Sequence, residues 1–349
     1  MTLACTALLL GALAPVTAAA QREAPRWVVR RDAFAELWYH GLATVGADDY
    51  GPLPLYSASH ARSVRETKRA RGLITRLDSA SRTLRAVFAG DSSFDALHFV
   101  PLYFVGTEPG VALTALREAL AGNRAGSAVP LPIAARAAAV ARSIPGARNR
   151  QALLTFVDAL AVEWRTVVRD ERATWQPSAR TIDELQRAWE SRFAIPLSSY
   201  LAASERSRGT IVVVPALGRE GRVVSLRGDV SVVMVSADPV AGVNDAPLFA
   251  AVRELAFALL DEVPPARLTA GHSRLAAERE REVAAVRGGA MLLEAVAPSL
   301  APSYRRVFMA GAAGQRNSTF ERDYPLHPRA ESALRAAAAR YSPPQSTQE

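Results

Sequence analysis

Lysine and cysteine are almost missing from this sequence. Among 349 residues Cys5 is the only cysteine, and Lys68 is the only lysine among 42 basic residues. Cys5 lies in an apolar N-terminal segment, so a chain that has lost this segment would contain neither disulfides nor a thiol nucleophile. The preference for arginine, together with abundant alanine, is typical of a GC-rich genome rather than of selection for phosphate contacts.

The positive charge does not form a pattern that is typical of nucleic-acid binding. The formal net charge is +8, and the densest basic run is "RSVRETKRARGLITR" at residues 62–76. This run has no interleaved aromatic residues and spreads its arginines around a predicted helix instead of along one face. We therefore expect a solvated helix surface there and no nucleic-acid partner.

Motifs of several enzyme classes are also missing. The sequence has no phosphate-binding loop, no dinucleotide-binding glycine pattern after a strand and no calcium loop. "GHSRL" at residues 271–275 lacks the second glycine of a serine-hydrolase elbow, so Ser273 is interpreted as a helix N-cap. No two histidines have the spacing of zinc ligands on a helix. The histidines are His40, His60, His98, His272 and His327.

The first twenty residues have the composition of a signal peptide. "MTLACTALLLGALAPVTAAA" carries no charge and ends in small residues, which predicts an apolar core and cleavage near Ala20. The protein is therefore expected to be secreted or periplasmic. Contact with a membrane would arise only through this segment if it were not removed.

Helical periodicity dominates residues 21–205. "RRDAFAELWYHGLATVG" and "RNRQALLTFVDALAVEWRTVVRDE" each place their apolar residues on one face of a helix, and "SARTIDELQRAWESRF" begins at a potential N-cap, Ser178. We interpret His40 as a hydrogen-bonded residue at the margin of a helix packing face. His98 lies among aromatic residues that predict a buried cluster.

The pattern changes in residues 206–343, before a tail at residues 344–349 that we expect to be disordered. "GTIVVVP", "GRVVSLRG" and "DVSVVMVS" predict three strands of an antiparallel meander. Two long helices follow, one at residues 244–265 with Asp245 as N-cap and one at residues 273–296. The predicted fold class is α+β, with a mostly helical N-terminal half and a C-terminal half in which a small antiparallel sheet packs on two long helices.

The first of these two helices contains one acidic residue in an apolar stretch, "VRELAFALL". Zinc is often held by two histidines at positions i and i+4 of a helix, with a glutamate general base after the first histidine and a third ligand from a later helix. Here Arg253 and Phe257 are four residues apart, Glu254 follows Arg253, and Glu282 lies in the later helix. Because neither Arg253 nor Phe257 can donate a lone pair, we expect no metal and no cofactor.

The order of strands, first helix and glutamate-containing second helix resembles the catalytic half of gluzincin-type, thermolysin-like zinc metallopeptidases. The resemblance covers roughly residues 209–296. It implies that Glu254 holds the position of the general base and Glu282 that of the third ligand, whereas Arg253 and Phe257 replace both histidines. A stronger form of this hypothesis predicts that the Arg253 guanidinium fills the metal position and binds Glu282 in bidentate geometry.

Several functional interpretations stay open on the sequence alone. The resemblance, the replaced histidines and the expected signal peptide together favour an exported, catalytically inactive metallopeptidase-like protein that keeps a cleft for a peptide or protein partner. One alternative is an active hydrolase with an unconventional site around Glu254, and another is a structural cell-envelope protein. The simplest interpretation of Glu254 itself is a local ion pair in a buried helix.

Overall fold

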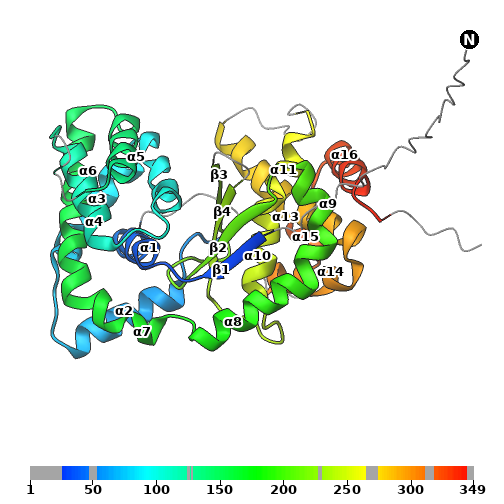
Figure 1. The fold of residues 1–349 in the computed structure, drawn as a ribbon, viewed down its shortest axis with the longest axis horizontal. Coiled ribbons are helices and arrows are strands. Elements are labelled where there is room, and N and C mark those ends of the chain that lie inside the picture. The colour runs from blue at the N-terminus through cyan, green and yellow to red at the C-terminus, as the bar shows by residue number, and fades with distance from the viewer. Residues whose placement is uncertain are drawn as a thin grey trace, which may run out of the picture.

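The computed structural model describes residues 26–46, 53–123, 126, 129–226, 230–264, 274–310 and 318–343. Most of these residues are helical, and four strands form one sheet in the order β1-β2-β4-β3 (Figure 1). The expected signal peptide and C-terminal tail lie outside the described residues. The strands are β1 (Arg26–Arg30), β2 (Arg208–Val214), β3 (Arg222–Leu226) and β4 (Val230–Ser236).

The sheet is mixed, so the prediction of an antiparallel meander is wrong. β1 and β4 both pair with β2 in parallel, whereas β3 pairs with β4 in antiparallel orientation. The sequence "VSVVMVS" is apolar enough for burial on both faces, and β4 therefore lies inside the sheet. "RVVSL" carries the exposed Ser225 and forms the edge strand β3. β1 was not predicted. In the structure its residues alternate between exposed and buried, as expected for a strand with one face in the core.

Gln186 covers the outer edge of β1. Its Oε1 atom accepts a hydrogen bond from the Val29 amide at 2.6 Å, and its Nε2 atom donates to the Trp27 carbonyl at 3.0 Å. A side-chain amide thereby replaces the pairing that a further strand would provide. At the opposite end of the sheet, the outer edge of β3 pairs with no other strand of the described residues.

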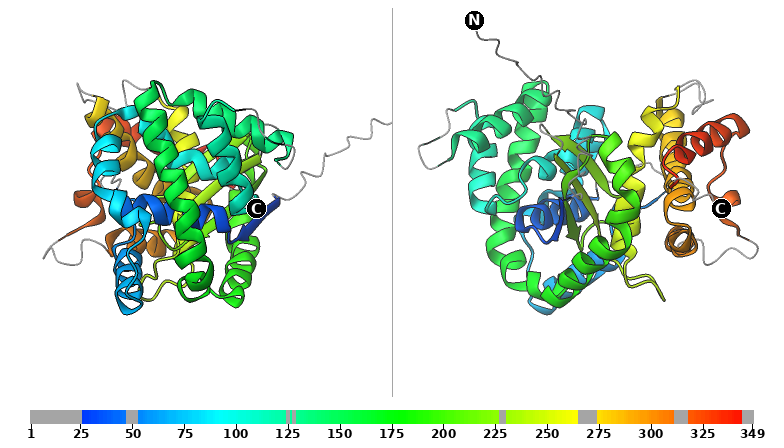
Figure 2. Two further views of the ribbon diagram at one scale, coloured as in Figure 1. Left: turned by 90° about the vertical axis from the view of Figure 1, so that its left-hand side faces the viewer. Right: turned by 45° about the vertical axis from the view of Figure 1, so that its right-hand side comes forward.

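The first helical layer covers one face of the sheet (Figure 2). Val212 and Val214 of β2 and Val232 and Met234 of β4 point into this layer and join its apolar core. Its elements are α1 (Ala33–Val45), α2 (Ala58–Ala70), α3 (Arg76–Ala89), η1 (Ser92–Tyr103), α4 (Pro109–Leu120), α5 (Leu131–Ser143), α6 (Ala147–Glu163), η2 (Trp164–Val168) and α7 (Arg169–Trp175).

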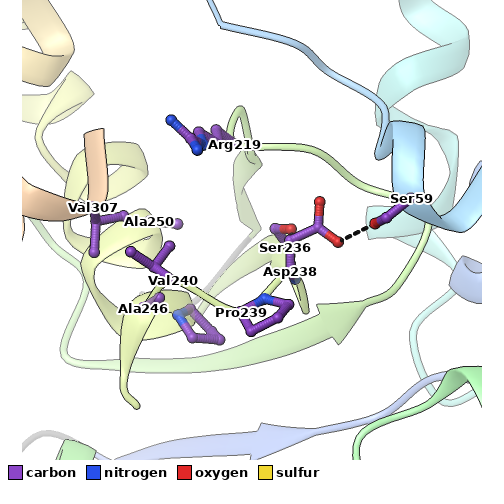
Figure 3. A pocket seen from close by; sticks show the side chains of 10 residues that line it. Ser59, Arg219, Ser236, Asp238, Pro239, Val240, Ala246, Ala250 and Val307 are labelled. Atoms are coloured by element: carbon purple, nitrogen blue, oxygen red, sulfur yellow. Dashed lines mark hydrogen bonds between the residues drawn. The ribbon is translucent and has the colours of Figure 1, made fainter. Parts of the chain in front are cut away.

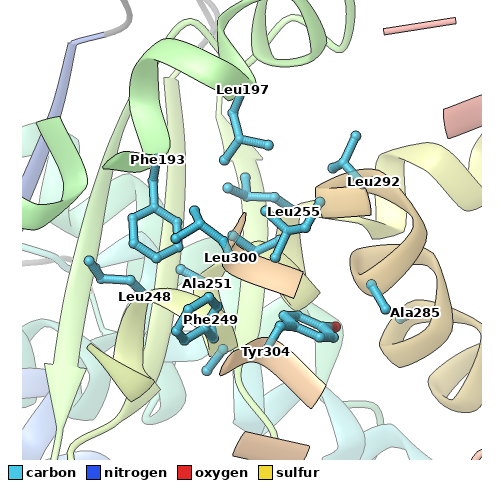
Figure 4. Packing of buried hydrophobic residues seen from close by; sticks show 14 of the residues in the cluster. Phe193, Leu197, Leu248, Phe249, Ala251, Leu255, Ala285, Leu292, Leu300 and Tyr304 are labelled. Atoms are coloured by element: carbon cyan, nitrogen blue, oxygen red, sulfur yellow. The ribbon is translucent and has the colours of Figure 1, made fainter. Parts of the chain in front are cut away.

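The second helical layer covers the opposite face. Ile211 and Val213 of β2 and Val233 and Val235 of β4 point into this layer, whose core also contains the Phe249 ring (Figure 4). Its elements are α8 (Ala179–Ala188), η3 (Trp189–Ala194), α9 (Ile195–Ala203), α10 (Ala246–Leu255), α11 (Phe257–Asp261), α13 (Arg274–Val296), η4 (Pro298–Leu300), α14 (Ala301–Met309), α15 (Phe320–Asp323) and α16 (Pro328–Ala339).

Several local predictions are confirmed. The helical N-terminal half and the long helix α13 are present, and the Ser178 side chain caps α8 by accepting from the Thr181 amide. The predicted first helix of the C-terminal half is interrupted at Ala256, which separates α10 from α11. Asp245 precedes α10, but its carboxylate pairs with Arg192 at 2.6 Å instead of capping the helix.

Two properties of the helices bear on the predicted partners. The arginines of α2 are exposed at Arg62, Arg65 and Arg69, which confirms the predicted solvated surface, whereas Lys68 is buried. Across the described ranges, no helix has the length and the apolar composition needed to cross a membrane.

Candidate functional site

The four residues of the altered zinc motif come together between α10, α11 and α13. Arg253 is completely buried, and its Nη1 atom donates to Oε1 of the neighbouring Glu254. Its Nη2 atom forms an ion pair with Oε2 of Glu282, which reaches in from α13. The guanidinium carbon lies 5.0 Å from the centre of the Phe257 ring, so positions 253 and 257 face each other.

The expected contact between Arg253 and Glu282 is therefore present, but its form differs from the prediction. Different nitrogens of Arg253 bind Glu254 and Glu282, so that the guanidinium bridges two carboxylates and does not bind one of them in bidentate fashion. A guanidinium has five donors and no lone pair, so it holds carboxylates but cannot activate water as a Lewis acid does. The ion pair thereby joins α10 to α13.

Glu254 is also held against the start of β3. Its Oε1 atom accepts a hydrogen bond from the Gly221 amide at 3.1 Å, and only 2% of the residue is exposed. A Cβ atom at position 221 would lie 2.8 Å from Cγ of Glu254 and 2.6 Å from the Met234 carbonyl oxygen. Glycine is therefore required for the carboxylate to approach the strand this closely. Because both bonds use the carboxylate, Glu254 is poorly placed to act as a general base.

A second buried ion pair lies at the start of β3. Arg222 donates to Glu220 and to the Gly221 carbonyl, and its guanidinium stands 5.5 Å from the Phe99 ring of η1. Burial raises the pKa of the Tyr39 hydroxyl far above its ordinary range, opposed by Arg222 and reinforced by Glu254. Tyr39 stays protonated and donates to the His98 carbonyl at 2.6 Å.

The aromatic cluster predicted around His98 is only partly buried. Phe94 and Phe104 are buried, and Nδ1 of His98 lies 2.8 Å from the Tyr56 hydroxyl. Phe99 and Tyr103 are 38% and 39% exposed, so the prediction of a wholly buried cluster is wrong for these two residues. Both belong to η1, which packs beside β3. The exposed Phe99 ring lies next to Arg222 at the start of the edge strand.

A pocket of about 270 Å³ opens at the carboxyl end of β4 (Figure 3). Ser236 and Asp238 come from the end of that strand, and Arg219 comes from the connection that leads from β2 to β3. Ala246 and Ala250 of α10 line the pocket on the helix that also carries Arg253. Among the described residues, no group of three His, Cys, Asp or Glu side chains is arranged to hold a metal ion.

A buried polar cluster in the first helical layer was not predicted, because its members are far apart in sequence. The Nε2 atom of His40 lies 2.9 Å from Oε1 of Glu163, and Nδ1 of His40 lies 3.3 Å from Nε2 of His60. Lys68 binds Glu163 at 2.6 Å and Asp78 at 2.8 Å. The cluster links α1, α2, α3 and α6. Its sequence signals are the single lysine and His40, which the structure shows to be hydrogen-bonded as predicted but buried inside the layer and not at its margin.

Burial changes the protonation of this cluster. Burial raises the pKa of Glu163, but hydrogen bonds and charges from His40 and Lys68 outweigh it and lower the pKa to about 2. Glu163 is therefore ionised, and its Oε1 atom accepts a hydrogen bond from Nε2 of His40. Burial, reinforced by repulsion from His40, lowers the pKa of His60 to about 3, so His60 is neutral at physiological pH.

No protein-family model, curated protein or solved structure matches this chain.

Replacing Arg253 by methionine is expected to destabilise the fold by about 3–5 kcal/mol, because it leaves the buried carboxylate of Glu254 without its partner. Urea unfolding of Arg253→Met and of the double variant Arg253→Met/Glu254→Met measures the effect. The double variant should recover part of the loss. Arg180→Met, which removes an exposed pair with Glu184, is the control and should change stability little. Equal stability of Arg253→Met and the wild type would contradict this account.

His60 should lower the free energy of unfolding as the pH drops from 6.5 toward 3, because the unfolded chain protonates it at its ordinary pKa of 6.5 and the folded chain resists until about 3. Glu36, whose pKa burial raises from 4.5 to about 7, gains stability on acidification and offsets this loss down to pH 4.5. The wild type should therefore lose stability mainly below pH 4.5, where Glu163, whose pKa is lowered from 4.5 to about 2, adds to the loss.

The free energy of unfolding of His60→Gln and of the wild type is measured in urea across this pH range. Glu36 is present in both chains, so its contribution cancels in the difference between them. The variant should lose less stability on acidification, whereas His327→Gln, at an exposed helix N-cap, should follow the wild type. Parallel curves for His60→Gln and the wild type would refute the assignment.

Proposed function

We propose that this chain is a catalytically inactive, exported relative of gluzincin-type zinc metallopeptidases, and that it binds an extended peptide beside β3. The observation that carries the first part is the buried Arg253 guanidinium, which bridges Glu254 on α10 and Glu282 on α13. These are the positions at which the family resemblance implies the general base and the third zinc ligand. Phe257, at the implied second histidine position, contacts the same guanidinium.

The charge balance supports this reading. A zinc site that lost its histidines would leave two carboxylates facing each other, and burial would penalise their charges unless a cation replaced the metal. Arg253 supplies this cation from one of the two vacated positions. Because a guanidinium keeps its charge in proteins, the carboxylates stay paired at any physiological pH. If Arg253 were buried only for local stability, its second partner could come from any neighbouring element. It comes instead from Glu282, at the position implied for the third zinc ligand.

Peptide binding is supported by the state of the two sheet edges. Gln186 covers β1, whereas β3 ends the sheet without a partner strand among the described residues. An edge strand offers amides and carbonyls that an extended peptide can pair with. The exposed ring of Phe99 on η1 lies next to Arg222 of β3 and would contact a side chain of the peptide.

The two alternatives receive less support. An active hydrolase around Glu254 would need this carboxylate to reach a water molecule, yet Glu254 is bonded to Arg253 and Gly221 and is almost inaccessible. A purely structural role in the cell envelope is favoured by no particular contact. Export itself is a proposal that rests on the composition of residues 1–20.

Restoring both histidines should create a zinc site if α10 and α13 keep the geometry of the family. The double variant Arg253→His/Phe257→His is expected to bind about one zinc ion per chain, with Glu282 as the third protein ligand. Mass spectrometry of protein purified without chelator and offered zinc measures the stoichiometry. Adding Glu282→Gln should abolish stoichiometric binding, because it removes the third protein ligand, whereas Glu280→Gln on the same helix should not. A folded double variant that binds no zinc would remove the basis for the family proposal.

Peptide binding can be tested by a proline scan of β3. Neighbouring residues of an antiparallel strand direct their amides to opposite sides, so Val224→Pro and Ser225→Pro remove one amide from the β4 pairing and one from the outer edge. The variant that keeps the thermal stability of the wild type identifies the outer amide. Selection of random peptides on the wild-type chain should yield ligands that this variant binds at least tenfold more weakly. Ligands bound equally by both proline variants and the wild type would place the peptide elsewhere.

A further inference from the structure

The pocket at the end of β4 lies where the topology of the sheet favours a ligand. β2 and β4 are parallel neighbours, and the connection from β2 crosses past the end of β4 to reach the edge strand β3. Open sheets bind ligands outside the carboxyl ends of their parallel strands, at the point where the connections diverge. Ser236 and Asp238 come from the carboxyl end of β4, and α10 starts a few residues later.

Two opposite charges face this pocket from different segments. Arg219 lines one side, and no hydrogen bond or ion pair joins it to another described residue. Asp238 lies on the side of the pocket nearer to Ser59, away from Val307 and Ala250 (Figure 3). Its Oδ1 atom accepts from the hydroxyls of Ser57 and Ser59, each at 2.9 Å. These two bonds fix the orientation of the carboxylate, so that the pocket contains a positioned anion and a cation available to a ligand.

The rest of the pocket lining is largely apolar, and the pocket is small. Val240, Ala250 and Val307 contribute aliphatic groups to the lining, and the volume of about 270 Å³ lies below the usual range for sites of drug-sized ligands. Ser59 and Pro239 are exposed, so the pocket is accessible from solvent. A fitting ligand is therefore a small molecule with a negative group, a positive group and a short aliphatic part.

We propose that this pocket binds a free α-amino acid with a small aliphatic side chain. Arg219 binds the carboxylate, for which the planar guanidinium offers two parallel donors. Asp238 accepts from the ammonium group, and the side chain contacts Val240, Ala250 and Val307. The site is separate from the edge of β3 and does not depend on the metallopeptidase proposal.

Calorimetric titration of the full chain with L-valine and its two half-molecules tests this site. L-valine should bind saturably, whereas isobutyrate, which lacks the ammonium group, and isobutylamine, which lacks the carboxylate, should bind at least tenfold more weakly. If L-valine and L-alanine both fail to bind, or if isobutyrate binds as tightly as L-valine, the proposal is wrong.

Three variants assign the contacts. Arg219→Gln removes the cation, and Asp238→Asn removes the negative charge while keeping an oxygen that can accept from Ser57 and Ser59. Each should weaken L-valine binding roughly tenfold or more without changing the thermal unfolding of the ligand-free chain. Arg306→Gln, next to Val307 but outside the pocket lining, is the matched control and should bind like the wild type. Unchanged affinity in either pocket variant would overturn the assignment.

Discussion

The ion pairs of the buried Arg253 guanidinium are the constraint on which the second helical layer depends. A charge without solvent access is tolerated only if its partners are close and well placed. Arg253 obtains them from its own helix through Glu254 and from α13 through Glu282, and the Phe257 ring lies against the same guanidinium. The packing of α10 against α13 is therefore specified by charge as well as by apolar contact.

This constraint extends into the sheet through one glycine. Glu254 reaches the Gly221 amide only because no side chain is present there, and Gly221 directly precedes the edge strand β3. The position of β3 is thus tied to the charged residues of α10. The first helical layer solves a similar problem separately, because His40, Lys68 and Glu163 satisfy one another in its interior. The protein therefore has two apolar cores on one sheet, each with its own buried polar group of residues.

Local patterns in the sequence predict several of the helices correctly, but they do not predict the order of the strands. The apolar faces around Phe34 and Phe156 and the cap at Ser178 depend on neighbouring residues, and the structure confirms them. Strand order depends on which strand is buried on both faces, and this comparison between β3 and β4 needs the whole sheet. The spacing of the zinc-binding motif identifies Arg253, Glu254 and Phe257, because it relates residues within one helix. Glu282 is identified by its place in the following helix. The contact of His40 with His60, and the presence of Arg219 and Asp238 in the lining of one pocket, bring together residues that no local spacing relates.

The central claim is that a guanidinium has taken the place of a metal ion between two carboxylates. Its most direct test is the zinc content of the wild-type chain, purified without chelator, exposed to excess zinc and measured by mass spectrometry. The account predicts no bound zinc and the same unfolding curve with or without chelator, because Arg253 already occupies both carboxylates. Stoichiometric zinc that disappears in Glu254→Gln or Glu282→Gln would contradict it and would indicate a functioning metal site.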